Sequence, residues 1–330
     1  MPTAKPETLN QRSQIENNTF LVTGGAGFIG SHIVEFLLNN KAKKVRVLDS
    51  LITGDINNIK TFESFPNFEF IQGDIKNPAD CEKACIGIDY ISHQAALGSV
   101  PRSIENPLAT HEANATGFLN ILVAAKNNWV KRVVFASSSS VYGDLNESPK
   151  VEHRIGKPLS PYAVSKLVNE QYAAIFASTY NMEIIGLRYF NIFGPRQNPN
   201  GAYAAAIPLF IESLLNNKEV FINGDGTQSR DFTFVANAVQ ANIKALLTDN
   251  KEALSKIFNI ACGESVSVNE MFSLIADEIK PGAKATHRGE RFGDVKNSLA
   301  DISLAKDLLG YNPEVLFKEG LKQTIDWFNQ

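Results

Sequence analysis

The stretch Phe20-Leu-Val-Thr-Gly-Gly-Ala-Gly-Phe-Ile-Gly-Ser-His32 decides the fold of this chain. A short β-rich run opens it, and Gly24, Gly27 and Gly30 follow. Glycines allow positive φ and a close approach of a pyrophosphate to the backbone, and the free N–H groups at a helix start bind phosphate. An apolar stripe with helical spacing then covers Phe28–Asn39. The pattern predicts a strand, a dinucleotide-binding turn and a helix.

An acidic residue at the end of the next predicted strand supports this interpretation. Asp49 stands nineteen residues after Gly30, directly after the β-rich run Val45–Leu48. A carboxylate there accepts hydrogen bonds from the adenosine ribose and repels a 2′-phosphate, so it favours NAD over NADP. Asp74 follows the third predicted strand, where it either holds the adenine or caps the next helix.

Length and composition exclude several classes of protein. The 330 residues exceed one compact domain, and 44% hydrophobic with 20% charged residues is typical of a globular protein. A net charge of −3, with both signs mixed along the chain, predicts no nucleic-acid partner and no membrane-surface partner. The three cysteines, Cys81, Cys85 and Cys262, argue against a disulfide framework, and we expect no metal site. The polar start of the chain has no secretory signal, so we expect a cytoplasmic protein.

Short β-rich runs alternate with amphipathic stretches over the first half of the chain. Near-continuous apolar strands of this kind predict a parallel sheet covered on both faces. We therefore expect an α/β protein with a Rossmann-type doubly wound parallel sheet and a smaller, interleaved C-terminal α/β substrate lobe. The expected division is a polar N-terminal leader (1–18), a dinucleotide-binding domain (19–190, with later returns near 230–262) and a substrate lobe (191–330). The predicted strands are Phe20–Thr23, Val45–Leu48, Phe68–Gln72, Tyr90–Ser92, Val133–Ser137, Ile184–Arg188 and Ile257–Ile260.

Tyr162-Ala-Val-Ser-Lys166 places a phenol and an ammonium on one side of a predicted helix. Ser160 suits the N-cap and Pro161 the first helical position, which puts Tyr162 in the first turn. Lowering a tyrosine pKa from about 10 to near 7 requires roughly 4 kcal/mol of preferential stabilisation of the phenolate. We expect the helix start, Lys166 and an oxidised nicotinamide ring to supply it, so that Tyr162 is a general base at neutral pH.

A run of hydroxyl side chains follows the fifth predicted strand in Phe135-Ala-Ser-Ser-Ser-Ser-Val-Tyr-Gly143. Ligands of open parallel sheets bind at the carboxyl ends of the strands. A serine run is also compatible with a polar loop. Its combination with the glycine turn, Asp49 and the Tyr162/Lys166 pair favours an active site.

These motifs together resemble those of the extended short-chain dehydrogenase/reductase family. TGGAGFIGSH, Asp49, GDI, HQAA, SSSSVYG, Tyr162-x-x-x-Lys166 and RYFNIFGPR occur in the family's order, and the resemblance runs from about residue 18 to the end. Within the family, HQAALGSVPRSIENP, IGKPLSPYAVSK and NPNGAYAAAIP resemble the NAD-dependent UDP-N-acetylglucosamine 4-epimerases. That branch includes enzymes that act on the corresponding uronic acid.

The resemblance implies a role for each site residue. The catalytic residues are expected to be Ser138, Tyr162 and Lys166. The expected NAD-binding residues are Gly24, Gly27, Phe28, Ile29, Gly30, Asp49, Asp74, Ile75, Ala95, Ala96, Asn114, Tyr162, Lys166 and Tyr189. The expected residues for the UDP-sugar are Gly98, Ser99, Arg102, Ser138, Ser139, Asn191, Ala205, Phe221, Arg230, Arg291, Asp294 and Ser298.

The resemblance to the family also implies which sugar the site accepts. Ser298 aligns with a tyrosine of epimerases that are restricted to non-acetylated sugars, and a small side chain there leaves room for an N-acetyl group. Gly98, Ser99 and Ala205 are expected to complete this wall of small residues. Arg102 either reaches the carboxylate of a uronic acid or is structural.

The implied activity is 4-epimerisation of UDP-N-acetylhexosamines through a 4-keto sugar, with UDP-N-acetylglucosaminuronic acid as the alternative substrate. A 4,6-dehydratase or a decarboxylase of this family needs an acidic residue where this chain has Ser139 or Ser140. A non-catalytic NAD-binding regulator would not need Tyr162 and Lys166. The stretches Ala113–Asn127 and Tyr162–Tyr180 resemble helices that pair across a dimer interface in relatives, so we expect a homodimer.

Overall fold

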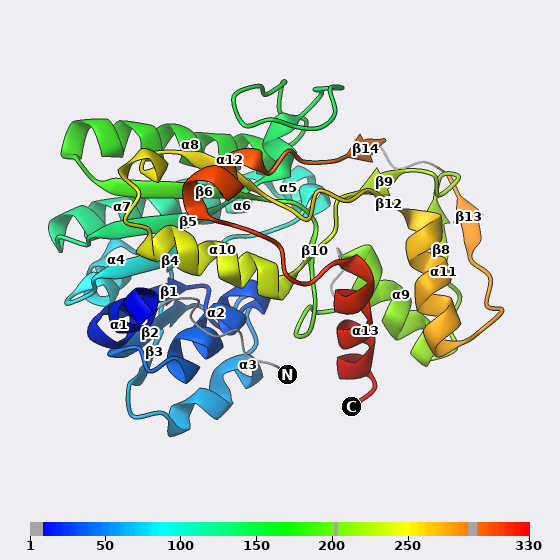
Figure 1. The fold of residues 1–330 in the computed structure, drawn as a ribbon, viewed down its shortest axis with the longest axis horizontal. Helices are drawn as coiled ribbons and strands as arrows, with labels where there is room; N and C mark the ends of the chain where they lie inside the picture. The colour runs from blue at the N-terminus through cyan, green and yellow to red at the C-terminus, as the bar shows by residue number, and fades with distance from the viewer. Residues whose placement is uncertain (1–8, 201–203, 290–295) are drawn as a thin grey trace.

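The large part of the molecule is a seven-stranded parallel sheet between two layers of helices (Figure 1). The computed structural model describes residues 9–200, 204–289 and 296–330. The strands of the sheet are β1 (Thr19–Thr23), β2 (Lys44–Asp49), β3 (Phe68–Gln72), β4 (Tyr90–His93), β5 (Arg132–Ser138), β6 (Glu183–Tyr189) and β11 (Ile257–Ile260). Every predicted strand is present, which confirms the expected fold class.

The strands are ordered β11-β6-β5-β4-β1-β2-β3, and every neighbouring pair is parallel. All five residues of β1 are buried, as are six of the seven in β5, because helices cover both faces. The strand order reverses between β1 and β4, so the connections that leave these two strands diverge. That divergence opens a crevice at the carboxyl ends of the strands.

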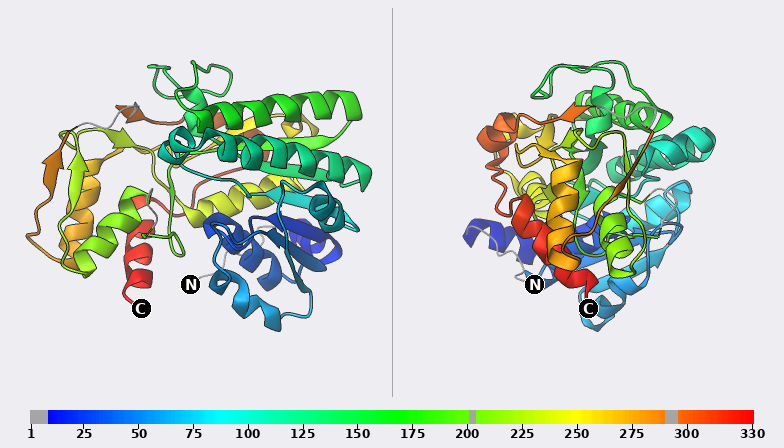
Figure 2. Two further views of the ribbon diagram at one scale, coloured as in Figure 1. Left: turned by 180° about the vertical axis from the view of Figure 1, so that it is seen from behind. Right: turned by 90° about the vertical axis from the view of Figure 1, so that its right-hand side faces the viewer.

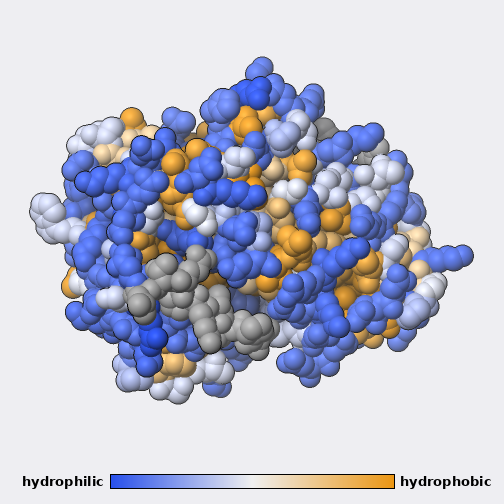
Figure 3. Space-filling view, viewed as in Figure 1, coloured by the Kyte–Doolittle hydropathy of each residue, from blue (hydrophilic) through white to orange (hydrophobic). Residues whose placement is uncertain are grey.

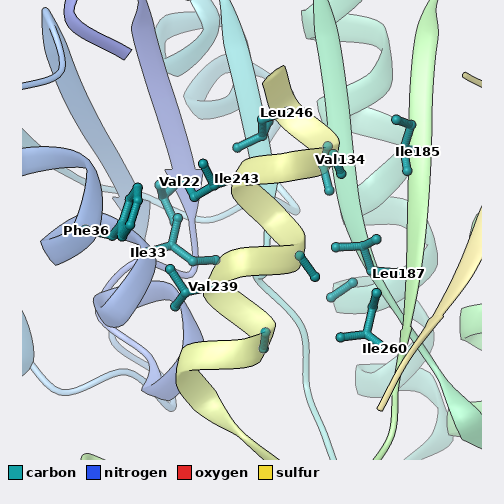
Figure 4. Packing of buried hydrophobic residues seen from close by; sticks show 14 of the residues in the cluster. Val22, Ile33, Phe36, Val134, Ile185, Leu187, Val239, Ile243, Leu246 and Ile260 are labelled. Carbon is teal, nitrogen blue, oxygen red and sulfur yellow. The ribbon is translucent and has the colours of Figure 1, made fainter. Parts of the chain in front are cut away.

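Helices from distant parts of the sequence form the two covering layers (Figures 1 and 2). One face carries α2 (Phe28–Asn39), α10 (Val235–Leu247) and α12 (Ser303–Leu309), and the other carries α4 (Pro78–Cys85), α7 (Gly117–Asn127) and α8 (Pro161–Tyr180). Figure 4 shows how α10 joins the first layer: Val239 and Ile243 approach Ile33 of α2, and the strands lie behind them.

A smaller lobe stands at the side of the sheet where the strands end (Figures 1 and 2). Its helices are α9 (Ala206–Leu215), α11 (Val268–Ile279) and α13 (Phe317–Phe328). Phe193 lies in its core, with ring centroids 5.7 Å from Phe234 and 5.5 Å from Phe317. The short strands are β7 (Ile192–Phe193), β8 (Phe221–Asn223), β9 (Ser229–Arg230), β10 (Thr233–Phe234), β12 (Val266–Ser267), β13 (Thr286–Arg288) and β14 (Asn297–Ser298).

The remaining short helical segments connect these elements. They are α3 (Asn57–Lys60), α5 (Val100–Glu105), α6 (Pro107–His111), the π-helix η2 (Glu112–Thr116), and the 3₁₀ turns η1 (Thr61–Ser64), η3 (Ser139–Tyr142) and η4 (Lys251–Ala253).

Part of the expected polar leader is folded. Helix α1 (Leu9–Asn17) buries Ile15 completely in the main core, and the Gln14 amide donates to Asp249 at 3.2 Å. Hydrophobic and hydrophilic side chains are interspersed over the face in Figure 3. Within the described ranges, no helix has the length and apolar character needed to cross a bilayer.

Candidate active site

A cavity of about 650 Å³ lies at the carboxyl ends of the large sheet's strands. Parts of the chain that follow β1, β2, β3, β4 and β5 contribute to its wall, so the sheet topology itself creates it. The residues predicted to bind NAD that line it are Gly24, Gly27, Phe28, Ile29, Gly30, Asp49, Asp74, Ile75, Ala95, Ala96, Tyr162, Lys166 and Tyr189.

The glycine turn is held so tightly that side chains do not fit at two of its positions. Gly24 has φ +68°, and a Cβ on it would lie 2.6 Å from the Ala95 nitrogen. A Cβ on Gly30 would lie 2.2 Å from the Gly24 carbonyl oxygen. Gly27 is the N-cap of α2 and lines the cavity. The turn therefore presents bare backbone and a helix start to the cavity, as a diphosphate requires.

The Asp49 carboxylate is fixed at the edge of the same cavity. Its Oδ2 accepts from the Ala26 N–H at 3.0 Å, and its Oδ1 accepts from the Leu51 N–H at 2.8 Å. Burial raises the pKa of this carboxyl, and the two N–H donors oppose that effect. Each oxygen retains a second lone pair, so the carboxylate fits a ribose diol. A Cβ on Gly54 would lie 2.9 Å from Oδ1, so the glycine leaves room beside the carboxylate.

Asn114 is the predicted cofactor-binding residue that lies outside this cavity wall. Its amide accepts from the Leu97 N–H at 2.8 Å and donates to the Leu97 carbonyl at 3.2 Å and to Ser165 Oγ at 3.1 Å. The side chain is 1% exposed. Asn114 therefore ties the loop after β4 to α8 from behind, because its polar atoms are already used within the protein.

Ser138, Tyr162 and Lys166 meet at the end of β5, and all three line the cavity. Ser160 caps α8 by accepting from the Ala163 N–H at 3.1 Å, and Pro161 opens the helix, as predicted. Lys166 lies one turn after Tyr162 and donates from Nζ to the Ala136 carbonyl at 2.8 Å. The helix start and the strand end thus hold the phenol, the hydroxyl and the ammonium together.

The pKa of Tyr162 in the protein alone is set mainly by burial. Burial raises the pKa of Tyr162, and the hydrogen bond with Ser138 lowers it only in part. Burial also lowers the pKa of Lys166 to about 8, against the opposing charge of Glu170. The protein's own groups therefore do not depress the tyrosine pKa below its usual value, because desolvation is the largest effect on both side chains.

Two further cavities adjoin the first around Asn191, which lines all three. The second cavity, of about 820 Å³, is lined mostly by residues of the small lobe. The predicted UDP-sugar residues that line it are Ser99, Asn191, Ala205, Phe221 and Arg230. The third, of about 220 Å³, contains Ser139, Asn191, Arg230 and Ser298. Gly98 lines the first cavity instead, Arg102 lines none of the three, and Arg291 and Asp294 lie outside the described residues.

Arg288 is a candidate ligand-binding residue that the sequence interpretation missed. Its guanidinium carbon lies 5.5 Å from the centroid of the Phe221 ring, and its Nε donates to Asn223 Oδ1 at 2.6 Å. All three side chains line the second cavity. Arg288 belongs to the short strand β13, which pairs with β8, and no strand was predicted at this position. The cation beside the Phe221 ring combines a positive charge with an aromatic surface, which suits an aromatic base.

Comparison with known proteins identifies the family. A family model described as the NAD dependent epimerase/dehydratase family matches residues 20–261. The chain belongs to this family. The resemblance noted in the sequence is thereby confirmed, and NAD is the cofactor that the glycine turn and Asp49 fit.

Relatives of known structure and relatives known from sequence align with this chain over nearly its whole length. A UDP-N-acetylglucosamine 4-epimerase from Methanobrevibacter ruminantium M1, in complex with UDP-N-acetylmuramic acid, is 40% identical with a TM-score of 0.89, covering 95% of this chain and 99% of that one. A UDP-glucuronic acid 4-epimerase from Bacillus cereus, in complex with UDP-glucuronic acid and NAD, is 34% identical with a TM-score of 0.87, covering 94% and 99%. The UDP-glucuronate 4-epimerase of Thermodesulfobacterium geofontis is 34% identical over 316 residues, 93% of this chain and 95% of the relative. The chain thus groups with nucleotide-sugar 4-epimerases.

Proposed function

We propose that this protein is a 4-epimerase of UDP-N-acetylhexosamines that interconverts UDP-N-acetylglucosamine and UDP-N-acetylgalactosamine through a transient 4-keto sugar. The observation that carries the proposal is that Ser138, Tyr162 and Lys166 line the cavity of the glycine turn, which shares Asn191 with the two other cavities. A cofactor in the first cavity and a nucleotide sugar in the others would be brought together beside these residues.

The chain's own groups supply the proton chemistry. Bound NAD would accept the hydride from carbon 4 of the sugar and return it to the opposite face. Tyr162 removes the proton of the 4-hydroxyl and gives it back after the ketone has turned. Ser138 hydrogen-bonds the reacting oxygen beside it. Lys166, anchored to the Ala136 carbonyl, keeps a positive charge near the phenol below its pKa of about 8.

The preference for an acetylated sugar rests on small side chains. Ser298 lines the third cavity, where a tyrosine would fill part of the space of about 220 Å³. Ala205 and Ser99 line the adjoining second cavity. A 4-epimerase of UDP-N-acetylglucosaminuronic acid is the second candidate, since two of the relatives act on a uronic acid. Arg102 is not among the described residues that line the three cavities, so this side chain does not decide between the two substrates.

A dehydratase or decarboxylase activity finds little support in the same site. Ser139 and Ser140 occupy the turn that follows β5, and neither can serve as a carboxylic acid that protonates a leaving group. A non-catalytic regulator is disfavoured because the phenol, the ammonium and the hydroxyl all line the cavity.

A homodimer in the cytoplasm is part of the proposal. Helices α7 and α8 expose apolar side chains on the outer face of the sheet: Val123 (41%), Val164 (49%), Tyr172 (37%) and Ile175 (58%). Apolar side chains on two packed neighbouring helices suit a helical interface with a second copy. A mass of one chain by light scattering at micromolar concentration would contradict the dimer.

The decisive experiment follows the sugar's 4-position by proton NMR. Purified protein is incubated separately with UDP-N-acetylglucosamine, UDP-glucose and UDP-N-acetylglucosaminuronic acid, without added cofactor. We expect inversion of UDP-N-acetylglucosamine well above UDP-glucose. Faster inversion of the uronic acid would favour the second candidate, and loss of water or of carbon dioxide would overturn the epimerase proposal.

A further inference from the structure

A buried ion pair lies directly behind the candidate catalytic residues. Arg188 on β6 donates from Nη2 to Glu170 Oε2 at 2.7 Å and from Nε to Glu170 Oε1 at 2.9 Å. The two side chains are only 4% and 6% exposed. This bidentate geometry holds both side chains in one orientation.

The pair is connected to the strand that carries Ser138. Ser137 Oγ donates to Glu170 Oε1 at 2.5 Å, and Ser137 directly precedes Ser138 on β5. Glu170 lies one turn beyond Lys166 on α8. The carboxylate thus joins the helix of Tyr162 and Lys166 to the strand of Ser138.

Arg188 fixes the other end of the serine run. Its Nη1 donates to the Glu152 carbonyl at 3.0 Å, and its guanidinium carbon lies 4.9 Å from the centroid of the Tyr142 ring. Tyr142 ends the 3₁₀ turn that begins at Ser139. The turn that follows Ser138 is therefore packed on the same guanidinium.

Stability alone is a weak reason for such a pair. Taking two charges out of water is costly, and apolar residues of similar volume often replace buried pairs without loss of stability. What apolar side chains cannot provide is a directed contact from one carboxylate on the helix to both neighbouring strands, β5 and β6. The geometry therefore favours a role in positioning.

We propose that Glu170 and Arg188 are positioning residues, which hold the hydroxyl of Ser138 and the ammonium of Lys166 in register with Tyr162. The inference rests on the proposed function for the identity of the reacting groups. The charges around Lys166 agree with it. The Glu170 carboxylate raises the pKa of Lys166, and His93 on β4 stays neutral because burial lowers its pKa to about 3.

The test compares Glu170→Gln with a matched control at the other end of the same strands. Arg132 of β5 and Glu183 of β6 form another Arg–Glu pair at 2.7 Å, far from the carboxyl ends, in which Glu183 is 42% exposed. We expect Glu170→Gln to lower kcat by about tenfold or more with KM within about twofold. The alkaline limb of its kcat profile should move to lower pH, because Lys166 loses the carboxylate that keeps it protonated. Glu183→Gln should change neither kcat nor the profile, and Glu170→Asp should restore part of the rate.

Two further measurements keep the test decisive. Ser137→Ala leaves the ion pair intact, and we expect about a threefold or larger loss of kcat from the lost link to β5. NMR of ¹³Cε-labelled lysines, with the Lys166 signal identified from Lys166→Met, reports the Lys166 pKa without turnover. If the wild type is inactive but the Lys166 pKa is lower in Glu170→Gln, the proposed reaction is rejected and the positioning role stands. An unchanged profile, an unchanged Lys166 pKa and a kcat loss equal to that of Glu183→Gln would overturn the positioning role.

Discussion

The Nζ atom of Lys166 lies 5.9 Å from the centroid of the Tyr162 ring and 2.8 Å from the Ala136 carbonyl oxygen. The ammonium is thus held by the strand and acts on the phenol through space. Because burial is the largest effect on Tyr162 and raises its pKa, the phenol is the stable form at neutral pH in the protein alone. Any positive charge brought close to the ring favours the phenolate.

Replacing Tyr162 by Phe should remove the proton-transfer step. General acid–base groups typically contribute about 10²- to 10⁴-fold to a rate, so we expect kcat to fall by that order while NAD stays bound. Tyr172 lies on the same helix and is 37% exposed, which makes Tyr172→Phe the matched control. Kinetics by NMR and the absorbance of released cofactor measure both effects. Retention of half the activity in Tyr162→Phe would reject its role as the base.

Gly30→Ala should damage the glycine turn. The new Cβ would lie 2.2 Å from the Gly24 carbonyl oxygen, a contact that backbone atoms must move to relieve. We expect a loss of bound NAD and a lower midpoint of thermal unfolding, by several degrees for about 2 kcal/mol. At Gly289, a Cβ would meet none of the described atoms within 4 Å, so Gly289→Ala is the control. Equal cofactor content in both variants would show that the turn tolerates the methyl group.

Asp231→Asn should destabilise the junction of the two lobes. The fully buried carboxylate accepts from the N–H groups of Cys262 at 2.9 Å, Gly263 at 3.0 Å and Ala300 at 3.3 Å. An amide has one acceptor oxygen, so at least one buried N–H loses its partner, at about 1–3 kcal/mol. Urea unfolding measures the difference, and the exposed Asp326→Asn should leave stability unchanged. A wild-type midpoint for Asp231→Asn would contradict the proposed cost.

His93 should make stability fall in mild acid. Its Nδ1 lies 2.8 Å from Thr23 Oγ1, and burial lowers its pKa from 6.5 to about 3. The unfolded chain therefore binds more protons than the folded one between these values, so this contribution is complete above pH 6.5 and is lost as pH falls toward 3. The slope per histidine reaches about 1.4 kcal/mol per pH unit.

Urea unfolding of His93→Asn at pH 7, 6 and 5 checks this dependence. We expect a shallower fall than in the wild type, with a remainder from His32, whose pKa burial lowers to about 4. His153 is exposed, and His153→Asn should keep the wild-type slope. An unchanged slope in His93→Asn would mean that His93 does not take up a proton on unfolding in this range.

Local sequence pattern was sufficient to predict the strands of the large domain. The predicted strands Phe68–Gln72 and Ile257–Ile260 and the helix Phe28–Asn39 have the observed bounds, because β-rich runs and an amphipathic helical stripe are local sequence patterns. In the small lobe the pattern was less decisive. Helix α11 begins at the capping box Ser267-Val-Asn-Glu270, where Ser267 caps the helix, and this signal was overlooked.

What the sequence by itself determined is the kind of chemistry: a glycine turn, an acidic strand end, and a tyrosine four residues from a lysine. Tertiary structure alone decided whether a residue faces the cavity or the protein interior, and how far burial shifts the pKa of its side chain. Asn114 is within the site region in sequence, yet it faces the protein interior, and Arg288 reaches the second cavity only because β13 pairs with β8. The raised pKa of Tyr162 has the same origin, since desolvation depends on every element packed around the ring, and no local spacing encodes it.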